Sequence, residues 1–187
     1  MAAEYGRPAP LETWRRERDA IYDEIMQRGW SPALQAFRQH YETDVLDSSL
    51  LRMPTVGFIT PNDPMWASTL RAMEDELVND SLVYRYDPAA SPDGLSGDEG
   101  TFSLCTFQYV TALAGAGDLD KARLTFENML TYANHLGLFS EEIGLTGEQL
   151  GNFPQAFTHL ALIDAAVALN QRLDEARPAR RRHTTIR

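Results

Sequence analysis

The chain of 187 residues contains 43% hydrophobic and 24% charged residues, which is typical of one soluble globular domain and excludes collagen-like and wholly disordered chains. The net charge is −10, although residues 176–187 contain five arginines and no acid. The body of the chain is therefore more acidic than the total, which argues against recognition of a nucleic-acid backbone as its main task.

The sequence also predicts where the protein works. It contains no window of roughly 20 mostly apolar residues, as a membrane-spanning helix needs, and residues 1–18 lack the apolar core of a secretion signal. The single cysteine, Cys105, cannot form an internal disulfide, which suits a reducing compartment. We therefore expect a cytoplasmic protein that does not bind membranes.

Most of the chain has the apolar spacing of helices. In the first half, the pattern predicts a helix from about residue 11 to 26 that stops at Gly29, a short buried helix at 50–53, and a helix that begins at Asn62-Asp63-Pro64. Residues 37–46 are polar and lack periodicity, so we expect a loop or a short extended piece there.

The second half begins with a short β-prone segment at 82–86 and a loop rich in Pro, Asp, Gly and Ser. A nearly all-apolar helix follows at 102–114, which predicts burial on most sides. Further helices are expected from Asp118 or Asp120 to about 133 and from 154 to 173. We expect residues 176–187 to form a basic, disordered tail after a domain of residues 1–175.

Candidate catalytic groups are carboxylates in the loops between these helices. Glu141 and Glu142 lie between Leu138-Phe139 and Ile143, and burial of a carboxyl among apolar residues suits it to proton transfer. The alternative is an acid pair that stabilises the start of a helix.

Three other features allow both a structural and a functional interpretation. Acids in the segment Gly97-Asp98-Glu99-Gly100 precede the buried helix and either cap it or line a site. Arg85 lies between Tyr84 and Tyr86, a pattern that suits either an amphipathic strand or the binding of sugar hydroxyls. Cys105 lies within the apolar helix, where a buried core thiol is a commoner role than a nucleophile.

Five segments that follow one another along the chain identify a protein family more specifically than any single motif does. They are LDSSLLRMPTVGFITPNDP (46–64), LVYRYD (82–87), GDEGTFSLCTF (97–107), LGLFSEEI (136–143) and LGNFPQAFTHLALIDAA (150–166). Over about residues 10–175 the chain resembles the C-terminal part of glycoside hydrolase family 15, the glucoamylase-like enzymes that include bacterial trehalases.

The resemblance implies an all-α fold, the C-terminal helices of an (α/α)6 toroid. It also implies an inverting glycosidase that acts on α-linked glucose disaccharides or oligosaccharides without a cofactor or metal. The family's catalytic base matches Glu141, and its hydroxyl-binding arginine matches Arg85. Glu99, Glu142 and Asp47 fall at positions where the resemblance implies further substrate contacts.

The family's general acid is the glutamate of a Trp-Glu motif, and this sequence departs from that pattern. Trp14, Trp30 and Trp66 are followed by Arg, Ser and Ala. We therefore expect the chain to carry the base but not the family's acid segment. The alternative is a non-catalytic helical fragment that forms homo-oligomers or pairs with a separate N-terminal portion, because an incomplete toroid exposes apolar faces.

Overall fold

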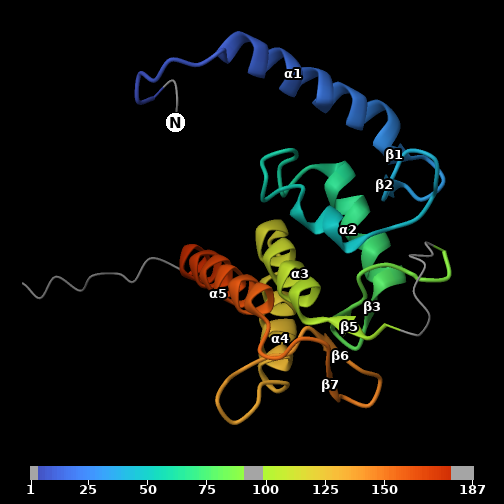
Figure 1. Ribbon diagram of the computed structural model, residues 1–187, viewed down its shortest axis with the longest axis vertical. Coiled ribbons are helices and arrows are strands. Elements are labelled where there is room, and N and C mark those ends of the chain that lie inside the picture. The colour runs from blue at the N-terminus through green and yellow to red at the C-terminus, as the bar shows by residue number, and fades with distance from the viewer. Residues whose placement is uncertain (1–3, 91–98, 178–187) are drawn as a thin grey trace, which may run out of the picture.

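The computed structural model describes residues 4–90 and 99–177, and within them it is mostly helical (Figure 1). The five longer helices are α1 (Leu11–Glu24), α2 (Pro64–Leu77), α3 (Ser103–Ala116), α4 (Leu119–Leu130) and α5 (Ala156–Ala176). Two short helices are a π-helical turn, η1 (Ile25–Gly29), and a 3₁₀ helix, η2 (Ser48–Arg52). The helices expected from the sequence are confirmed, with ends that differ by a few residues. Of the tail expected at residues 176–187, Ala176 lies in α5, and residues 178–187 lie outside the described residues.

Local sequence explains where the helices begin and end. The Asp63 carboxylate accepts a hydrogen bond from the Met65 amide at 2.8 Å, and Pro64 occupies the first turn of α2. Asp118 caps α4 in the same way through the Lys121 amide at 3.2 Å. Gly117 ends α3 with a φ of +91°, a left-handed conformation that glycine adopts without strain.

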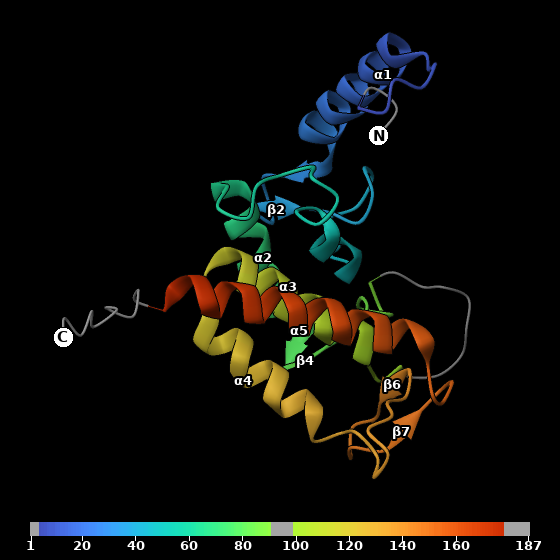
Figure 2. The same cartoon turned by 90° about the vertical axis from the view of Figure 1, so that its left-hand side faces the viewer.

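Helix α3 forms the centre of the core. It packs against α4, α5, η2 and β4, as Figure 2 shows for α4 and α5 lying alongside it. Phe107 of α3 is fully buried, and its ring contacts the rings of Phe126 on α4 and Phe139 in the loop that follows. Burial on most of its surface confirms the expectation from its apolar composition.

Within residues 4–90 and 99–177, three small antiparallel sheets connect the helices. Their strands are β1 (Trp30–Ser31) with β2 (Ala36–Phe37), β3 (Val78–Asn79) with β4 (Leu82–Val83), and β5 (Thr101–Phe102) with β6 (Glu142–Ile143) and β7 (Gln149–Leu150). Buried threonines join the first two sheets to the helices, since the hydroxyls of Thr69 and Thr106 accept hydrogen bonds at 3.0 Å from strand amides. The third sheet brings the start of α3 next to the Glu141-Glu142 segment.

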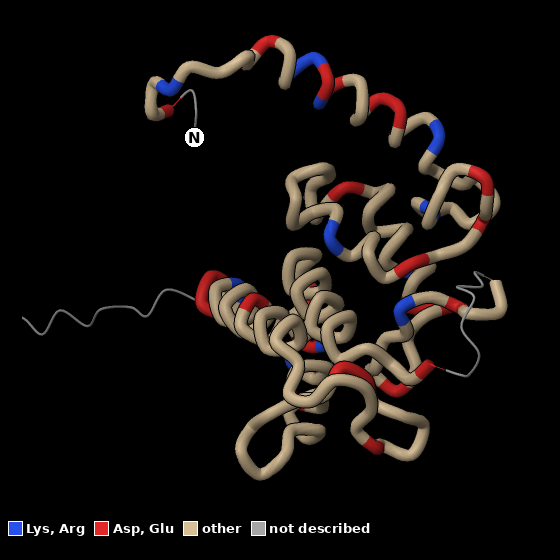
Figure 3. Tube along the Cα trace, viewed as in Figure 1, with Lys and Arg blue, Asp and Glu red and all other residues tan. Residues whose placement is uncertain are grey.

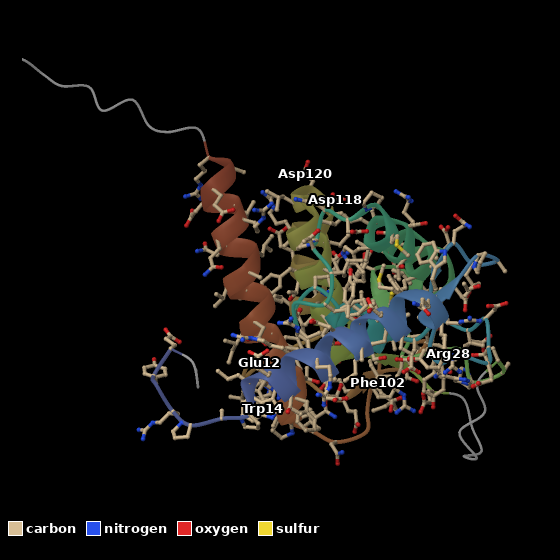
Figure 4. All side chains as sticks on the ribbon, turned by 90° about the horizontal axis from the view of Figure 1, so that it is seen from above. Glu12, Trp14, Arg28, Phe102, Asp118 and Asp120 are labelled. Atoms are coloured by element: carbon tan, nitrogen blue, oxygen red, sulfur yellow. The ribbon has the colours of Figure 1, made fainter. Side chains whose placement is uncertain are left out.

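Helix α1 stands apart from the other helices (Figures 1 and 2). None of its residues is buried, and Trp14 and Ile21 are 54% and 58% exposed. Charged residues of both signs follow its length (Figure 3). Seen from above, Glu12 and Trp14 lie in its first turns and Arg28 lies beyond its end (Figure 4). Among the described residues, no helix is both long and apolar enough to cross a membrane.

Candidate active site

Arg85 is held by hydrogen bonds and by contacts with aromatic rings. One guanidinium nitrogen, Nη2, donates to Glu99 Oε1 and to the Tyr86 hydroxyl, each at 2.6 Å. The guanidinium carbon lies 4.5 Å from the Tyr86 ring centroid and 4.9 Å from that of Phe102. A charge-assisted hydrogen bond and ring stacking together fix the orientation of the side chain.

The backbone around Asp47 pairs with the backbone around Arg85. It forms an antiparallel bridge with Tyr86, and the Ser48 amide donates to the Arg85 carbonyl at 2.7 Å. The Asp47 carboxylate accepts one hydrogen bond from the Ser49 amide at 2.7 Å and one from Gln39 Nε2 at 3.0 Å. Its side chain therefore caps η2 while its backbone positions the Arg85 segment.

Glu142 lies on β6 opposite Phe102, and its carboxylate binds the backbone of the preceding segment. Its Oε2 accepts a hydrogen bond from the Gly100 amide at 3.0 Å. Gly100 follows Glu99 directly, so this contact joins the Glu142 side chain to the segment that holds Arg85. Glu142 is therefore a structural partner of the site in this structure.

Glu141 is half-buried, and its carboxylate is held on one side only. Its Oε2 accepts hydrogen bonds from the backbone amide of Asn152 at 3.0 Å and from Asn152 Nδ2 at 2.9 Å. Its Oε1 accepts none from the part of the chain that the structure describes. The backbone carbonyl of Glu141 accepts from the Ser103 amide at 3.0 Å, which attaches it to the first residue of α3.

These contacts form a continuous set. Asp47, Arg85, Glu99 and Glu142 are linked through Tyr86 and Gly100, and Glu141 is the neighbour of Glu142 in the chain. Asp98 lies outside the described residues. The sequence did not single out Asn152, although this residue lies within one of the motif segments; the run Leu150-Gly151-Asn152 was the available signal.

Cys105 is buried in the core. Its Sγ lies 3.0 Å from the Ser48 hydroxyl, and burial, opposed by that contact, raises the pKa of the thiol to about 11. The interpretation as a core thiol is confirmed. Among the described residues, no group of three or more His, Cys, Asp or Glu side chains is placed to hold a metal ion.

Comparison with known proteins shows which family this chain resembles. The model of glycosyl hydrolases family 15 matches residues 1–167. The chain is 42% identical over 172 residues to a trehalase of Thermoplasma acidophilum, covering 91% of this chain and 29% of the relative. It is 41% identical over 177 residues to a trehalase of Mycobacterium tuberculosis, covering 94% and 26%. It thus spans less than a third of the length of these curated relatives.

Solved structures agree on the fold. A wild-type glycosidase superposes with a TM-score of 0.73 at 21% identity, over 87% of this chain and 46% of that one. A glycosidase variant in complex with glucose superposes with the same TM-score at 19% identity, over the same shares. The helical fold expected from the sequence is therefore confirmed. The chain belongs to glycosyl hydrolase family 15.

Proposed function

We propose that this chain carries the base of an inverting α-glucosidase site and that Glu141 is that base. The observation that supports the proposal most is the one-sided anchoring of its carboxylate. Asn152 holds Oε2 with two hydrogen bonds, while Oε1 accepts none from the described residues. A carboxylate fixed in this way has an oriented lone pair with which to take a proton from water.

The proposed substrate is an α-linked glucose disaccharide or oligosaccharide. The trehalase names of the relatives and the glucose complex of a similar structure support this class. In the proposed reaction Glu141 removes a proton from a water molecule, and that water attacks the anomeric carbon from the face opposite the leaving oxygen. Inversion then gives β-glucose, and the water needs a carboxyl separation of roughly 6.5–9.5 Å from the acid.

Arg85 is the proposed substrate-binding residue. Its fixed guanidinium has several N–H donors, which suit sugar hydroxyls. Glu99 orients it through the 2.6 Å contact, while Glu142 and Asp47 hold the two backbone segments on either side.

The proposed reaction also needs a general acid that protonates the leaving oxygen. We propose that it comes from a separate N-terminal portion. A substrate whose leaving group needs no protonation allows the base to be tested without the general acid. α-Glucosyl fluoride is such a substrate, because fluoride departs without an acid.

The test is fluoride release by the full chain, with the product anomer followed by NMR. We expect β-glucose from wild type and a loss of about 10²–10⁴-fold in Glu141→Gln, the usual contribution of proton transfer. Glu127→Gln makes the same change at an exposed position on α4 and serves as the control. An equal rate in Glu141→Gln, or no hydrolysis by folded wild type, contradicts the proposal. Hydrolysis of trehalose or maltose by the chain alone would show that it also contains an acid.

Exposed apolar side chains favour a second role, association. We propose that the chain forms homo-oligomers or pairs with a separate N-terminal portion. Phe157, Leu160, Ile163 and Val167 of α5 are each more than half exposed, and contiguous apolar surface of this kind marks interaction sites. This role does not require catalysis.

A further inference from the structure

The backbone pairing of β6 with β7 continues beyond the two strands to the start of α5, and Glu141 lies within this continuation. The Glu141 amide donates to the Asn152 carbonyl at 3.0 Å, and the Gln155 amide donates to the Phe139 carbonyl at 3.1 Å. Figure 2 shows β6 and β7 beside the N-terminal, orange end of α5, where the pairing finishes. The strands therefore hold Glu141 on its C-terminal side, and the Phe139–Gln155 pair holds it on its N-terminal side.

One hydrogen bond of the Phe139–Gln155 pair passes through a side chain. In a regular antiparallel pair, two facing residues can exchange both of their backbone hydrogen bonds. Here the bond from the Gln155 amide is direct, but the imidazole of His159 takes the place of the other. The Phe139 amide donates to Nε2 of His159 at 3.4 Å, and Nδ1 of the same ring lies 2.6 Å from the Gln155 carbonyl. The imidazole thus bridges the amide and the carbonyl that a regular pair joins directly.

The start of α5 explains why a side chain takes this place. The Gln155 carbonyl also accepts the His159 amide at 3.3 Å, as the first turn of a helix requires. Because residues four apart lie on the same face of a helix, the His159 side chain returns toward Gln155. Thr158 adds a neighbouring contact, since its hydroxyl lies 3.2 Å from the Ser140 carbonyl. The first turn of α5 therefore holds both residues that precede Glu141.

These contacts select one form of the His159 ring. A neutral imidazole has one N–H donor and one bare nitrogen, and the Phe139 amide requires the bare nitrogen as its acceptor. Nε2 is therefore bare, and Nδ1 carries the hydrogen that it donates to the Gln155 carbonyl. The ring also packs edge-on against the buried Phe139 ring, with the centroids 5.8 Å apart and 68° between the planes. Together these contacts fix the orientation of the ring and the position of its hydrogen.

The Phe139–Gln155 pair bears directly on the carboxylate of Glu141. Asn152, which donates two hydrogen bonds to that carboxylate, lies only three residues before Gln155. The two segments are also in close contact, because a Cβ atom on Gly151 would lie 2.9 Å from the Glu141 Cβ. A slip of Phe139 against Gln155 would therefore move Glu141 against Asn152. Displacement of a reacting group by about 1 Å can cost as much as a hundredfold in rate.

We infer that His159 is a positioning residue for the proposed base: its imidazole bridges Phe139 and Gln155 and so keeps the Glu141 carboxylate against Asn152. The inference rests on the role proposed for Glu141. His159 acts through the backbone of residues 139–141 and not on the substrate. Loss of its acceptor nitrogen should therefore lower kcat and leave KM nearly unchanged.

The first test compares two substitutions of His159 in the full chain, with α-glucosyl fluoride as substrate. Glutamine places an amide oxygen near the position of Nε2 and keeps an acceptor for the Phe139 amide, whereas the shorter asparagine does not reach it. We expect kcat to fall by about tenfold or more in His159→Asn and to stay within about threefold of wild type in His159→Gln. His40→Asn makes the same change at an exposed histidine and is the control.

The second test does not depend on activity. Proton–nitrogen correlation spectra of the imidazole rings at pH 8 show which nitrogen carries the hydrogen, and the signals missing from His159→Gln assign the ring. We expect the hydrogen of His159 on Nδ1 in wild type. A hydrogen on Nε2, a wild-type kcat in His159→Asn, or an equal loss of kcat in both variants would overturn the inference.

The Glu141→Gln variant separates this inference from the proposed function. If wild type releases fluoride, Glu141→Gln does not, and His159→Asn matches wild type, the role of His159 alone is refuted. If folded wild type releases no fluoride, the proposed function fails and the positioning role fails with it.

Discussion

Gly100 faces the carbonyl oxygen of Ile143 so closely that a Cβ atom on Gly100 would lie 2.5 Å from that oxygen. The same glycine donates its amide hydrogen to the Glu142 carboxylate at 3.0 Å. The segment that follows Glu99 therefore lies against β6 without room for a side chain. This close approach sets the spacing between the Arg85–Glu99 pair and the Glu141-Glu142 segment.

Gly100→Ala should disturb both the fold and the site. The neighbour that the new methyl group meets is backbone, so β6 must shift, and overpacking of this kind typically lowers the free energy of unfolding by about 1–3 kcal/mol. Urea denaturation measures the loss, and fluoride release from α-glucosyl fluoride should fall as well. Gly115→Ala in α3 is the control: its added Cβ would lie 3.5 Å from Pro61, and alanine favours the helix. Equal stability of wild type and Gly100→Ala would contradict this account.

Asn152→Ala tests the anchoring of the proposed base. The variant removes the 2.9 Å hydrogen bond from Nδ2 to Glu141 and keeps the one from the backbone amide. A hydrogen bond to a charged group is worth about 1.5–3 kcal/mol, so we expect kcat for α-glucosyl fluoride to fall by about tenfold or more. Asn170→Ala, at an exposed position on α5, should retain the wild-type rate. Full activity in Asn152→Ala would mean that Asn152 does not orient the base.

Arg85→Lys tests the proposed sugar-binding residue. A lysine keeps the charge, but it cannot combine the stacking on Tyr86 and Phe102 with the planar set of donors. We expect KM for α-glucosyl fluoride to rise by about tenfold, with a smaller change in kcat, because the lost interaction is mainly one of binding. Arg123→Lys on α4 is the matched exposed control. A change confined to kcat would assign Arg85 to the reaction step instead.

The raised pKa of Cys105 predicts how stability varies with pH. Burial is the main cause of the rise to about 11 from an ordinary value of 9.0. The folded state therefore favours the neutral thiol, and its contribution to stability is complete below pH 9 and is lost as the pH rises toward 11. Burial and Glu74 also raise the pKa of Tyr109, which adds a loss of the same sign at high pH.

Thiol reactivity checks this prediction directly. At pH 8 we expect a thiol reagent to modify folded protein far more slowly than protein in urea, because Cys105 is both buried and protonated. The midpoint of urea denaturation should also fall between pH 9 and 11, and by less in Cys105→Ala. Equal rates of modification in folded and unfolded protein would disprove the burial of this thiol.

Local patterns predicted the helices because each carries its own periodicity and end signals, as in Asn62-Asp63-Pro64 and Gly117. Apart from β4, which lies within the β-prone segment at 82–86, the two-residue strands could not be predicted in this way. Strand β6 exists because Ile143 pairs with Thr101, which is distant in the sequence, and no local repeat records that pairing. The segment between the last two helices was expected to be a loop, yet it contains β6 and β7.

The candidate site was also predicted only in part from the sequence. The resemblance singled out Glu141 and Arg85, and their roles stay predictions. The side chains that orient them, Asn152 and Glu99, are brought into contact by the chain's tertiary structure. Glu142 and Asp47 are expected as substrate contacts, and that role stays a prediction; in the structure each of their carboxylates accepts a hydrogen bond from a backbone amide. The contact between the Glu142 carboxylate and the Gly100 amide depends on the pairing of β5 with β6, which the spacing of residues in the sequence does not encode.

Helix α1 buries none of its residues, so its thermodynamics differ from those of the other helices. Fourteen residues are close to the minimum length at which a helix is marginally stable in water, and its stability depends on the helix–coil equilibrium. Its amide hydrogens should therefore exchange with solvent long before those of α3. Heating should melt α1 gradually, ahead of the cooperative transition of the core, so that the chain unfolds in two separable stages.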